Sequence, residues 1–306
     1  LGFEFVDAGD IIVFDTNGSL ILEETVKRTR ERLSKCENAV IPGFYGKTTE
    51  GIVKTFSRGG SDVTGSIVAR AVNADIYENW TDVSGFLVAD PRIVENPDVI
   101  SLITYKELRE LSYMGATVLH EDAIFPVREA GIPINIKNTN RPEDAGTMIV
   151  SDDHDFDDET CPHTITGIAG RKGFSVINIE KAMMNSEKGF GMKVLKVLYE
   201  NGISFEHMPS GIDTMSVVVD TSTLESVEDK IIAQLRKEVK PDHLEIEHGI
   251  ALLAIVGRRM KNTRGTVARL FASLAHARIN VKMVDQGSSE LNVIVGVNES
   301  DLSEAI

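Results

Sequence analysis

Apolar and polar positions alternate with two different periods along the first half of the chain. Short apolar runs at residues 11–14 and 39–41 are typical of buried strands, and residues 23–33 between them form a polar, charge-rich helix candidate. A second helix is predicted after residue 62, because its apolar side chains fall on one face: Val63, Ile67, Val68, Ala71 and Val72. This succession of strands and helices predicts an α/β fold with a mostly parallel sheet.

Local signals predict where several of these elements begin. Asp62 is expected to cap the helix that follows it, because a short acidic side chain accepts hydrogen bonds from free N–H groups at a helix start. Thr104 and Glu107 match a capping box, in which each side chain bonds the backbone of the other residue. A further helix is expected at residues 120–129 and a late strand at residues 132–136.

The second half of the chain repeats itself after about 76 residues. The equivalent positions are Gly189 and Gly265, Leu198 and Leu274, Ile203 and Ile279, and residues 217–219 and 293–295. Each unit reads as strand, helix, strand, strand, helix, which is the order of a ferredoxin-like βαββαβ motif. The elements of the first unit are expected at residues 175–179, 190–200, 203–207, 215–219 and 227–235, with a closing strand at 243–247.

The second unit begins near Ile250 and continues to Ile306, where Ser300 and Asp301 would cap its second helix. A strand predicted at residues 164–169 pairs either with the first unit or with the second, and the pattern alone leaves its partner open.

An acidic run at residues 151–163 contains no Lys or Arg, which is typical of a solvated connector between domains. It lacks the glycine and the terminal glutamate of an EF-hand, so calcium binding is not expected there. The expected domains are residues 1–150, an acidic linker at 151–163, a first repeat at 164–248 and a second repeat at 249–306.

Composition narrows the function classes. Hydrophobic residues make up 42% of the 306 positions and charged residues 26%, as in an ordinary globular protein. A formal net charge of −15 argues against nucleic-acid binding, and no apolar stretch is long enough for a membrane span, so a cytoplasmic location is expected. The two cysteines, Cys36 and Cys161, have no metal-ligand spacing and predict neither a disulfide framework nor a zinc site.

The loop at residues 58–62, with the sequence RGGSD, is the strongest chemical signal in the chain. Two glycines let backbone N–H groups approach an anion closely, and Arg58 offers a planar fork that suits a carboxylate or a phosphate. Because a helix follows, its N-terminus adds attraction for an anion. The loop is therefore a candidate ligand cradle.

Together with other segments, this loop resembles the aspartokinase family, whose members phosphorylate the side-chain carboxylate of aspartate with ATP. The segments that carry the resemblance are residues 43–46 (GFYG), 58–62 (RGGSD), 80–85 (WTDVSG), 90–92 (DPR), 113–120 (YMGATVLH) and 136–139 (IKNT). Their order and spacing are similar to the second half of that family's kinase domain. The repeated units resemble ACT domains, small modules that bind effectors. The resemblance implies part of an amino-acid-kinase sandwich followed by two ACT domains.

The resemblance also implies residue roles. Asp62 and Arg58 would be catalytic, and the substrate aspartate would be held by Arg58, Gly59, Gly60 and Ser61. ATP, as its magnesium complex, would be bound by Thr81, Asp82, Leu87, Arg92, Thr117 and Val118. An effector would be bound by Met184, Phe190, Gly191, Ser204, Phe205, Glu206 and Ser210. No tightly bound metal or organic cofactor is implied.

Several of these residues have a purely structural alternative. Asp62 would then only cap its helix, while Met184 and Phe190 would be core residues and Glu206 a solvated acid. Trp80 is expected to pack in the core rather than to stack on a base, because it lies inside a predicted strand. Asn280 and Asp285 repeat the effector geometry in the second unit, where a structural role is the alternative.

Two departures from the family pattern bear on activity. Many relatives carry lysine where this chain has Thr117, so a phosphate contact there would weaken. The family's N-terminal Lys-Phe-Gly-Gly strand, whose lysine engages the ATP phosphates, has no counterpart before Leu1-Gly2-Phe3. A carboxylate kinase needs that charge stabilisation, so we expect the chain to be part of a longer enzyme.

The leading hypothesis is an aspartate kinase that makes 4-phospho-aspartate, the first step toward lysine, threonine and methionine. Lysine, threonine or both would regulate it at the ACT domains by shifting the population of its states, and the favoured effector is lysine. Ferredoxin-like modules have exposed sheet edges, so a homodimer through the ACT domains is expected. The alternatives are a non-catalytic amino-acid sensor and a kinase for another amino acid or for a nucleoside monophosphate.

Overall fold

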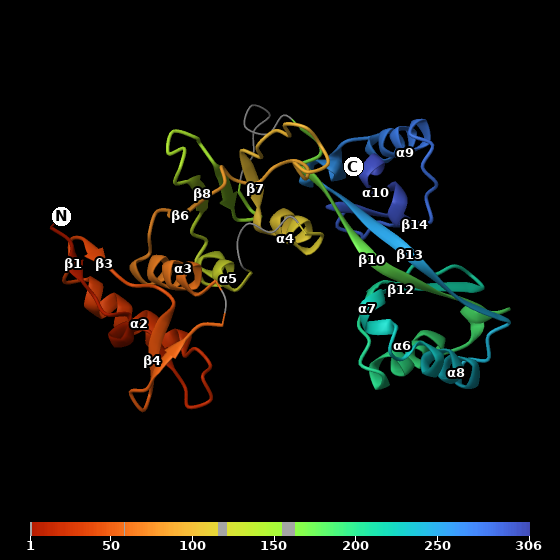
Figure 1. Ribbon diagram of the computed structural model, residues 1–306, viewed down its shortest axis with the longest axis horizontal. Helices are drawn as coiled ribbons and strands as arrows, with labels where there is room; N and C mark the ends of the chain where they lie inside the picture. Colours follow the sequence, from red (N-terminus) through yellow and green to blue (C-terminus); the bar gives the residue numbers. More distant parts are fainter. Residues whose placement is uncertain (1, 58, 116–120, 155–162) are drawn as a thin grey trace. The chain divides into compact units, whose positions relative to one another are not determined.

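The computed structural model describes residues 2–57, 59–115, 121–154 and 163–306, which divide into two compact units. The first unit comprises residues 1–91 and 96–166, and the second comprises residues 92–95 and 167–306. Figure 1 shows both units in sequence colours, and each is described here by itself.

The first unit is an α/β domain, as the alternating pattern predicts. Its helices are α1 (Ala8–Ile11), α2 (Leu22–Leu33), α3 (Gly60–Val72), α4 (Tyr105–Tyr113) and α5 (Glu121–Glu129). Its strands are β1 (Glu4–Phe5), β2 (Val13–Phe14), β3 (Ala39–Val40), β4 (Tyr45–Thr48), β5 (Val53–Thr55), β6 (Tyr77–Thr81), β7 (Leu102–Thr104), β8 (Ile134–Asn138) and β9 (Thr147–Val150).

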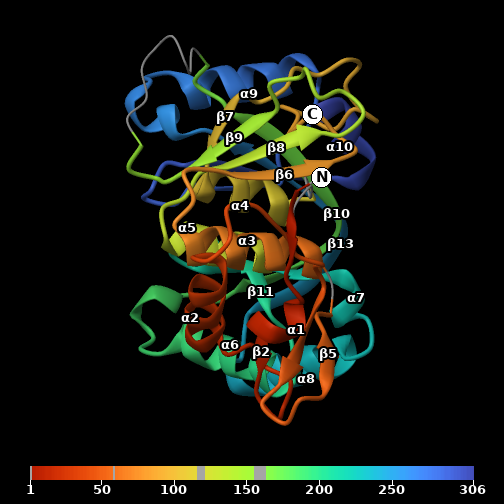
Figure 2. The ribbon, with the colours of Figure 1, turned by 90° about the vertical axis from the view of Figure 1, so that its left-hand side faces the viewer.

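Parallel pairings predominate among these strands. The pairs β1–β3, β2–β4, β6–β8 and β7–β9 are parallel, whereas β4–β5 and β8–β9 are antiparallel. In Figure 2 the strands β7, β9, β8 and β6 lie side by side in that order, with α3, α4 and α5 on the same side of this sheet. The α/β class is confirmed, with a sheet that is mixed rather than purely parallel.

Helix α3 packs between α2 and α5. Arg30 Nε of α2 donates to the carbonyl oxygen of Ala71 at 2.9 Å, and Arg70 of α3 is paired with Glu129 of α5. Val63, Ile67 and Ala71 of α3 are buried, whereas Val72 is 47% exposed, so the face predicted from the apolar spacing meets the core only in part. The left-handed backbone of Asn73 ends the helix.

Helix starts agree with the sequence in one case and differ in another. The capping box of α4 is confirmed, because both reciprocal bonds between Thr104 and Glu107 are present. The prediction that Asp62 caps α3 is wrong. Gly59 occupies the cap position with φ 61°, and the Asp62 side chain turns instead to a neighbouring strand.

The second unit is built on two long strands, β10 (Gly167–Glu180) and β13 (His243–Val256), which pair antiparallel along their length. Its other strands are β11 (Phe205–His207), β12 (Thr214–Asp220), β14 (Met283–Asp285) and β15 (Asn292–Asn298). Its helices are η1 (Met184–Ser186), α6 (Phe190–Glu200), α7 (Thr221–Leu224), α8 (Glu228–Glu238), η2 (Arg258–Asn262), α9 (Thr266–His276), η3 (Glu299–Asp301) and α10 (Leu302–Ala305).

The sheet order β11-β12-β10-β13-β15-β14 explains how the two repeats share these strands. Residues 174–180 of β10 pair with β12 of the first repeat, whereas residues 250–256 of β13 pair with β15 of the second. The segment whose partner the sequence left open, residues 167–171, pairs with residues 252–256 of the second repeat. The second repeat therefore takes an additional strand, residues 167–171, from the start of the first repeat.

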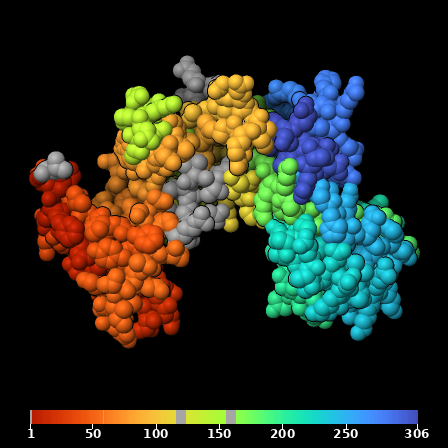
Figure 3. Space-filling model, in the orientation of Figure 1, coloured from red at the N-terminus to blue at the C-terminus, as the bar shows by residue number. Residues whose placement is uncertain are grey.

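Two predicted strand breaks are absent from the second unit as the structure describes it. The strands expected at 164–169 and 175–179 are one strand, β10, with a bulge near Gly173, and the closing strand at 243–247 continues through Ile250 as β13. Glu299 accepts a hydrogen bond from the Gly173 N–H at 2.7 Å, so the second repeat stabilises the bulge. In the space-filling view the two repeats form adjoining teal and blue lobes (Figure 3).

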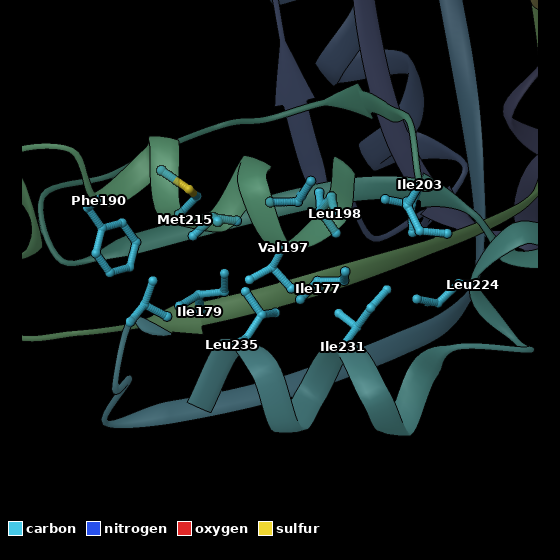
Figure 4. Close-up of a cluster of buried hydrophobic side chains, with 14 of the residues drawn as sticks. Ile177, Ile179, Phe190, Val197, Leu198, Ile203, Met215, Leu224, Ile231 and Leu235 are labelled. Carbon is cyan, nitrogen blue, oxygen red and sulfur yellow. The ribbon is translucent and has the colours of Figure 1, made fainter. Parts of the chain in front are cut away.

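A compact hydrophobic core fills the first repeat. Figure 4 shows Val197 and Leu198 of α6 and Ile231 and Leu235 of α8 pointing toward Ile177 on β10. All five side chains are at most 1% exposed. The helices predicted at 190–200 and 227–235 from the order of the repeat are thus confirmed as the cover of this sheet, with α8 beginning at Glu228 and extending to Glu238.

Candidate functional site

The glycine loop before α3 is held against a second predicted motif, residues 43–46. Phe44 N donates to Thr64 Oγ1 at 3.2 Å, and Thr64 Oγ1 donates to the Gly60 carbonyl at 2.7 Å. A Cβ atom added at Gly60 would lie 2.6 Å from Phe56 Cβ, and one added at Gly43 would lie 3.0 Å from Ser61 Cα. Space therefore requires glycine at position 60, and position 43 is packed tightly against Ser61.

The start of α3 has the character of an anion site. Gly59 has a left-handed backbone and no side chain caps the helix, while Gly60 is buried and Ser61 is exposed. Uncapped N–H groups at a helix start attract negative charge. Gly59, Gly60, Ser61 and Asp62, which the sequence proposes as substrate and catalytic residues, lie together here, whereas Arg58 lies outside the described residues.

Asp62 lies in the first turn of α3, where strand β6 holds its carboxylate. Asn79 Nδ2 donates to Asp62 Oδ1 at 3.0 Å and lies 3.0 Å from the hydroxyl oxygen of Tyr77. The Tyr77 hydroxyl in turn donates to the Asp62 carbonyl at 3.2 Å. Burial raises the pKa of Tyr77 to about 12, so this phenol stays protonated. Neither Asn79 nor Tyr77 is among the residues proposed from the sequence.

Two more motifs meet at the carboxyl ends of β6 and β8. These strands are parallel, with Trp80 opposite Lys137 and Thr81 opposite Asn138. Thr139 donates to the Thr81 carbonyl from both its N–H and its hydroxyl at 2.8 Å. Ligands collect at the carboxyl ends of strands in open α/β sheets, so Thr81 and the exposed Asp82 stand at a suitable place for one.

The prediction that Trp80 packs in the core is wrong, because 44% of this residue is exposed. Its ring lies under Lys137, whose Nζ is 5.6 Å from the ring centroid, and its Nε1 donates to Glu78 at 3.2 Å. Trp80 points to the solvent side of β6, opposite to the buried Asn79, as the two-residue period of a strand requires.

The remaining nucleotide candidates are only partly brought together. Leu87 is half-buried and bridges to Val99, and Arg92 is exposed in the segment 92–95 that groups with the second unit. Thr117 and Val118 lie outside the described residues. Within the described part of the chain, no group of three or more His, Cys, Asp or Glu side chains is placed to hold a metal ion.

The effector candidates surround the start of α6 and the edge strand β11. Met184 and Phe190 are 5% and 4% exposed and belong to the core of the first repeat, whereas Ser204, Phe205 and Ser210 are exposed. Gly191 has room, since an added Cβ would meet only Met215 Cε at 3.6 Å.

Glu206 lies where β11 breaks its register, between Phe205 opposite Val219 and His207 opposite Val218. Burial raises the pKa of Glu206, against a smaller lowering by the neighbouring His207. His207 itself lies 2.8 Å from Asp285 Oδ2 of β14, so the outer strands of the two repeats touch through this pair. For Asp285 the sequence left a structural role as the alternative to effector binding, and this contact is a structural role.

A charge cluster beside Phe190 has no counterpart among the predicted residues. Glu187 accepts from Lys181 Nζ and Lys193 Nζ, each at 2.5 Å, and these bonds lower the pKa of Glu187 to about 2. Lys181 Nζ also lies 5.7 Å from the Phe190 ring centroid. No helical or strand spacing relates the three charged residues, so periodicity offered no signal for them.

The second repeat has a pocket at the corresponding place, the start of α9. Its volume is about 890 Å³, and its lining includes Lys261, Arg264, Thr266, Gln286 and Glu290. Among the described residues, no helix is long and apolar enough to cross a membrane.

Comparison with known proteins identifies the family. The amino acid kinase family model matches residues 6–138 and an ACT domain model matches residues 253–306. Aspartokinase 3 of Bacillus subtilis (strain 168) is 40% identical over 301 residues, which cover 98% of this chain and 65% of that protein. The chain spans 65%, 54% and 34% of the length of the first three curated relatives that it matches.

Solved structures agree with this result. The aspartate kinase of Clostridium acetobutylicum is 57% identical, with a TM-score of 0.92 over 99% of this chain and 69% of that one. Aspartokinase III of E. coli, at 23% identity and a TM-score of 0.71 over 99% of this chain and 68% of that one, shares the fold. The residues that meet at α3 and β6 thus lie in a chain that belongs to the aspartokinase family.

Proposed function

We propose that the protein containing this chain transfers the γ-phosphoryl group of Mg-ATP to the side-chain carboxylate of L-aspartate, giving 4-phospho-L-aspartate and ADP. The observation that carries the proposal is the junction of the uncapped start of α3 with the carboxyl ends of β6 and β8. One sheet edge thereby offers an anion cradle beside a second ligand position. Aspartokinase III of E. coli has been solved with aspartate and ADP.

The chemistry assigns roles without a general base. A carboxylate oxygen of aspartate is already ionised, so it attacks phosphorus as the bond to the β-phosphate oxygen breaks, and ADP leaves. Catalysis then rests on aligning two anions and neutralising charge. Arg58 and the N–H groups of Gly59, Gly60 and Ser61 would hold the aspartate carboxylates, and Asp62 would orient its ammonium group.

The nucleotide side of the site would be formed by Thr81, Asp82, Leu87, Arg92, Thr117 and Val118. The hydrogen bonds from Thr139 to the Thr81 carbonyl support this part of the proposal, because they fix the end of β6. Asp82 is exposed there and accepts from Thr81 Oγ1 at 3.2 Å. The reaction would occur in the cytoplasm and open the route to lysine, threonine and methionine.

Regulation belongs to the same proposal. Lysine, threonine or both would bind the first repeat near Met184, Phe190, Gly191, Ser204, Phe205, Glu206 and Ser210. The Glu206 carboxyl group, at the register shift of β11, supports this site, because a carboxylate suits an ammonium group. Aspartokinase III of E. coli has been solved with lysine and aspartate.

A homodimer through the ACT domains would complete the assembly. Exposed apolar side chains on adjoining loops of the first repeat support it: Met183 and Ile212 are each 71% exposed, and Asn185 N donates to the Ile212 carbonyl at 3.1 Å. Apolar side chains exposed to this extent favour burial against a partner.

The test measures ADP release with aspartate, glutamate and a nucleoside monophosphate offered separately, and hydroxylamine trapping identifies the acyl phosphate formed on an amino acid. We expect product with aspartate alone, and a loss of about 100-fold in the Asp62→Asn variant, which keeps the shape and removes the charge. Turnover with another acceptor would indicate a different kinase. Lysine or threonine binding by calorimetry without any turnover would instead indicate a sensor.

A further inference from the structure

The Asp62 carboxylate is held from outside its own helix. Its Oδ1 accepts from Asn79 Nδ2 at 3.0 Å, across the gap between α3 and β6. The backbone at the same residue is tied by the Tyr77 hydroxyl, which donates to the Asp62 carbonyl at 3.2 Å. Side chain and main chain of Asp62 are therefore both bonded to one strand.

Burial and packing make this network rigid. Asn79 is 8% exposed and its amide nitrogen meets both Asp62 and the Tyr77 hydroxyl, so the orientation of its side chain is set by two partners. Gly65, one turn after Asp62, makes room for the tyrosine, because an added Cβ would lie 2.8 Å from its hydroxyl oxygen. A loose surface contact would have none of these features.

The chemistry of the donor matters as well. An amide N–H is neutral, so it fixes one carboxylate oxygen without cancelling the charge of a carboxylate. A lysine or arginine in the same place would cancel it. The Asp62 side chain is thus oriented by a neutral donor rather than by a competing cation.

We propose that Asn79, supported by Tyr77, is a positioning residue that sets the Asp62 carboxylate for the ammonium group of the substrate. The inference rests on the proposed aspartate kinase activity and goes beyond it by naming the residue that orients Asp62. Phosphoryl transfer depends on the alignment of the reacting groups. An Asp62 carboxylate free to rotate would bind the substrate aspartate less tightly and would hold it out of line with the phosphoryl group.

The experiment compares the complete enzyme with Asn79→Val, Asn79→Asp and Tyr77→Phe, measuring kcat, the KM for each substrate and the dependence of kcat/KM for aspartate on pH. Asn79→Val keeps a strand-favouring side chain and removes the donor. We expect kcat/KM for aspartate to fall about 10- to 100-fold with the KM for ATP unchanged. Tyr77→Phe, which leaves the carboxylate bond intact, should lose less.

The pH profile separates positioning from a merely structural role. Asn79→Asp brings a second carboxylate against Asp62, and two adjacent carboxylates raise the pKa at which the pair becomes fully ionised. The acid limb of kcat/KM for aspartate should therefore move to higher pH. Asn135→Val on β8 serves as the matched control, because it places the same residue in the same sheet without touching Asp62.

If the wild type is active and the Asn79 variants show unchanged aspartate kinetics and an unmoved acid limb, this inference is overturned. The proposed function is not affected by that result. A folded wild type that neither turns over aspartate nor binds it in calorimetry would overturn the proposed function and this inference with it. Weaker aspartate binding by Asn79→Val than by wild type supports the inference even where turnover is too slow to measure.

Discussion

At the scale of single residues, the glycine loop before α3 packs tightly against two phenylalanine side chains. Gly60 is buried against Phe56 and Phe44, whose atoms lie 2.6 and 2.9 Å from the place where a Cβ would stand. The loop backbone and the phenylalanines therefore cannot move apart without disturbing β5 and the Phe44 carbonyl, which accepts from Phe56 N. Packing thus fixes the direction in which the N–H groups of α3 point.

Gly60→Ala should destabilise the first unit by about 1–3 kcal/mol, because the new methyl group overpacks this contact. Urea unfolding followed by circular dichroism measures the effect. Gly191→Ala is the control, since its Cβ would meet only Met215 Cε at an ordinary 3.6 Å, and its unfolding midpoint should stay close to that of the wild type. Equal stability of both variants would contradict the packing argument.

Glu187 predicts a pH dependence with a definite sign. Its folded-state pKa is about 2, below the ordinary value of 4.5, because Lys181 and then Lys193 donate to it. The unfolded state therefore binds the proton more readily, so this contribution is complete above about pH 4.5 and is lost as pH falls toward about 2. Glu187→Gln should be less stable than wild type at pH 6, with a difference that shrinks at pH 3 in denaturant titrations. A difference that grows as pH falls would refute the assignment.

At the scale of elements, α4 begins with a cap that also reaches the end of the first unit. Glu107 is fully buried and accepts from the Thr104 N–H and hydroxyl, and its other oxygen accepts from Thr166 Oγ1 at 2.6 Å. Buried carboxylates require such donors, because unpaired charge in the interior is costly. One local motif thereby orders residues that lie 59 positions apart.

Thr104→Ala should lower the free energy of unfolding by about 1–2 kcal/mol, the usual cost of losing a helix cap, with an added cost for the buried carboxylate it leaves underbonded. Thermal unfolding of the whole chain reports the change. The exposed Thr49 offers a comparison: Thr49→Ala should shift the midpoint far less. A similar shift in the unfolding midpoint of both variants would show that the Thr104 cap does not contribute to stability.

At the scale of the molecule, the two repeats of the second unit share one six-stranded sheet. Strands β10 and β13 run through both, and His207 of β11 touches Asp285 of β14 at 2.8 Å. Either repeat alone would leave half of a long strand without its partner. A ligand bound beside Glu206 would therefore lie next to His207, which contacts Asp285 of the second repeat.

Residues 164–306 expressed alone should unfold in a single cooperative transition, whereas residues 164–248 alone should fail to give one. The reason is that residues 167–171 pair only with residues 252–256 of the second repeat. Far-ultraviolet circular dichroism melting and differential scanning calorimetry of the same fragment decide the matter. Two separate transitions in the longer fragment would show that the repeats fold independently.

The sequence by itself determined the features that depend on neighbouring residues. A polar, charge-rich stretch predicts α2, apolar spacing predicts α3, and the Thr104 and Glu107 pair predicts the start of α4, because these signals act within a few turns. The 76-residue repeat predicts two modules of one kind, with α6 and α8 in the first. The motifs RGGSD and WTDVSG also predict which segments carry the chemistry, and this stays a prediction. They did not predict which side chains would meet.

Tertiary structure decided every contact between distant positions. The Asp62 carboxylate bonds to Asn79 rather than to its own helix, Trp80 faces outward under Lys137, and the bulge at Gly173 depends on Glu299, 126 residues later. These outcomes share one physical cause. A polar side chain takes the partner that packing brings within 3 Å, and packing depends on the whole core rather than on local sequence.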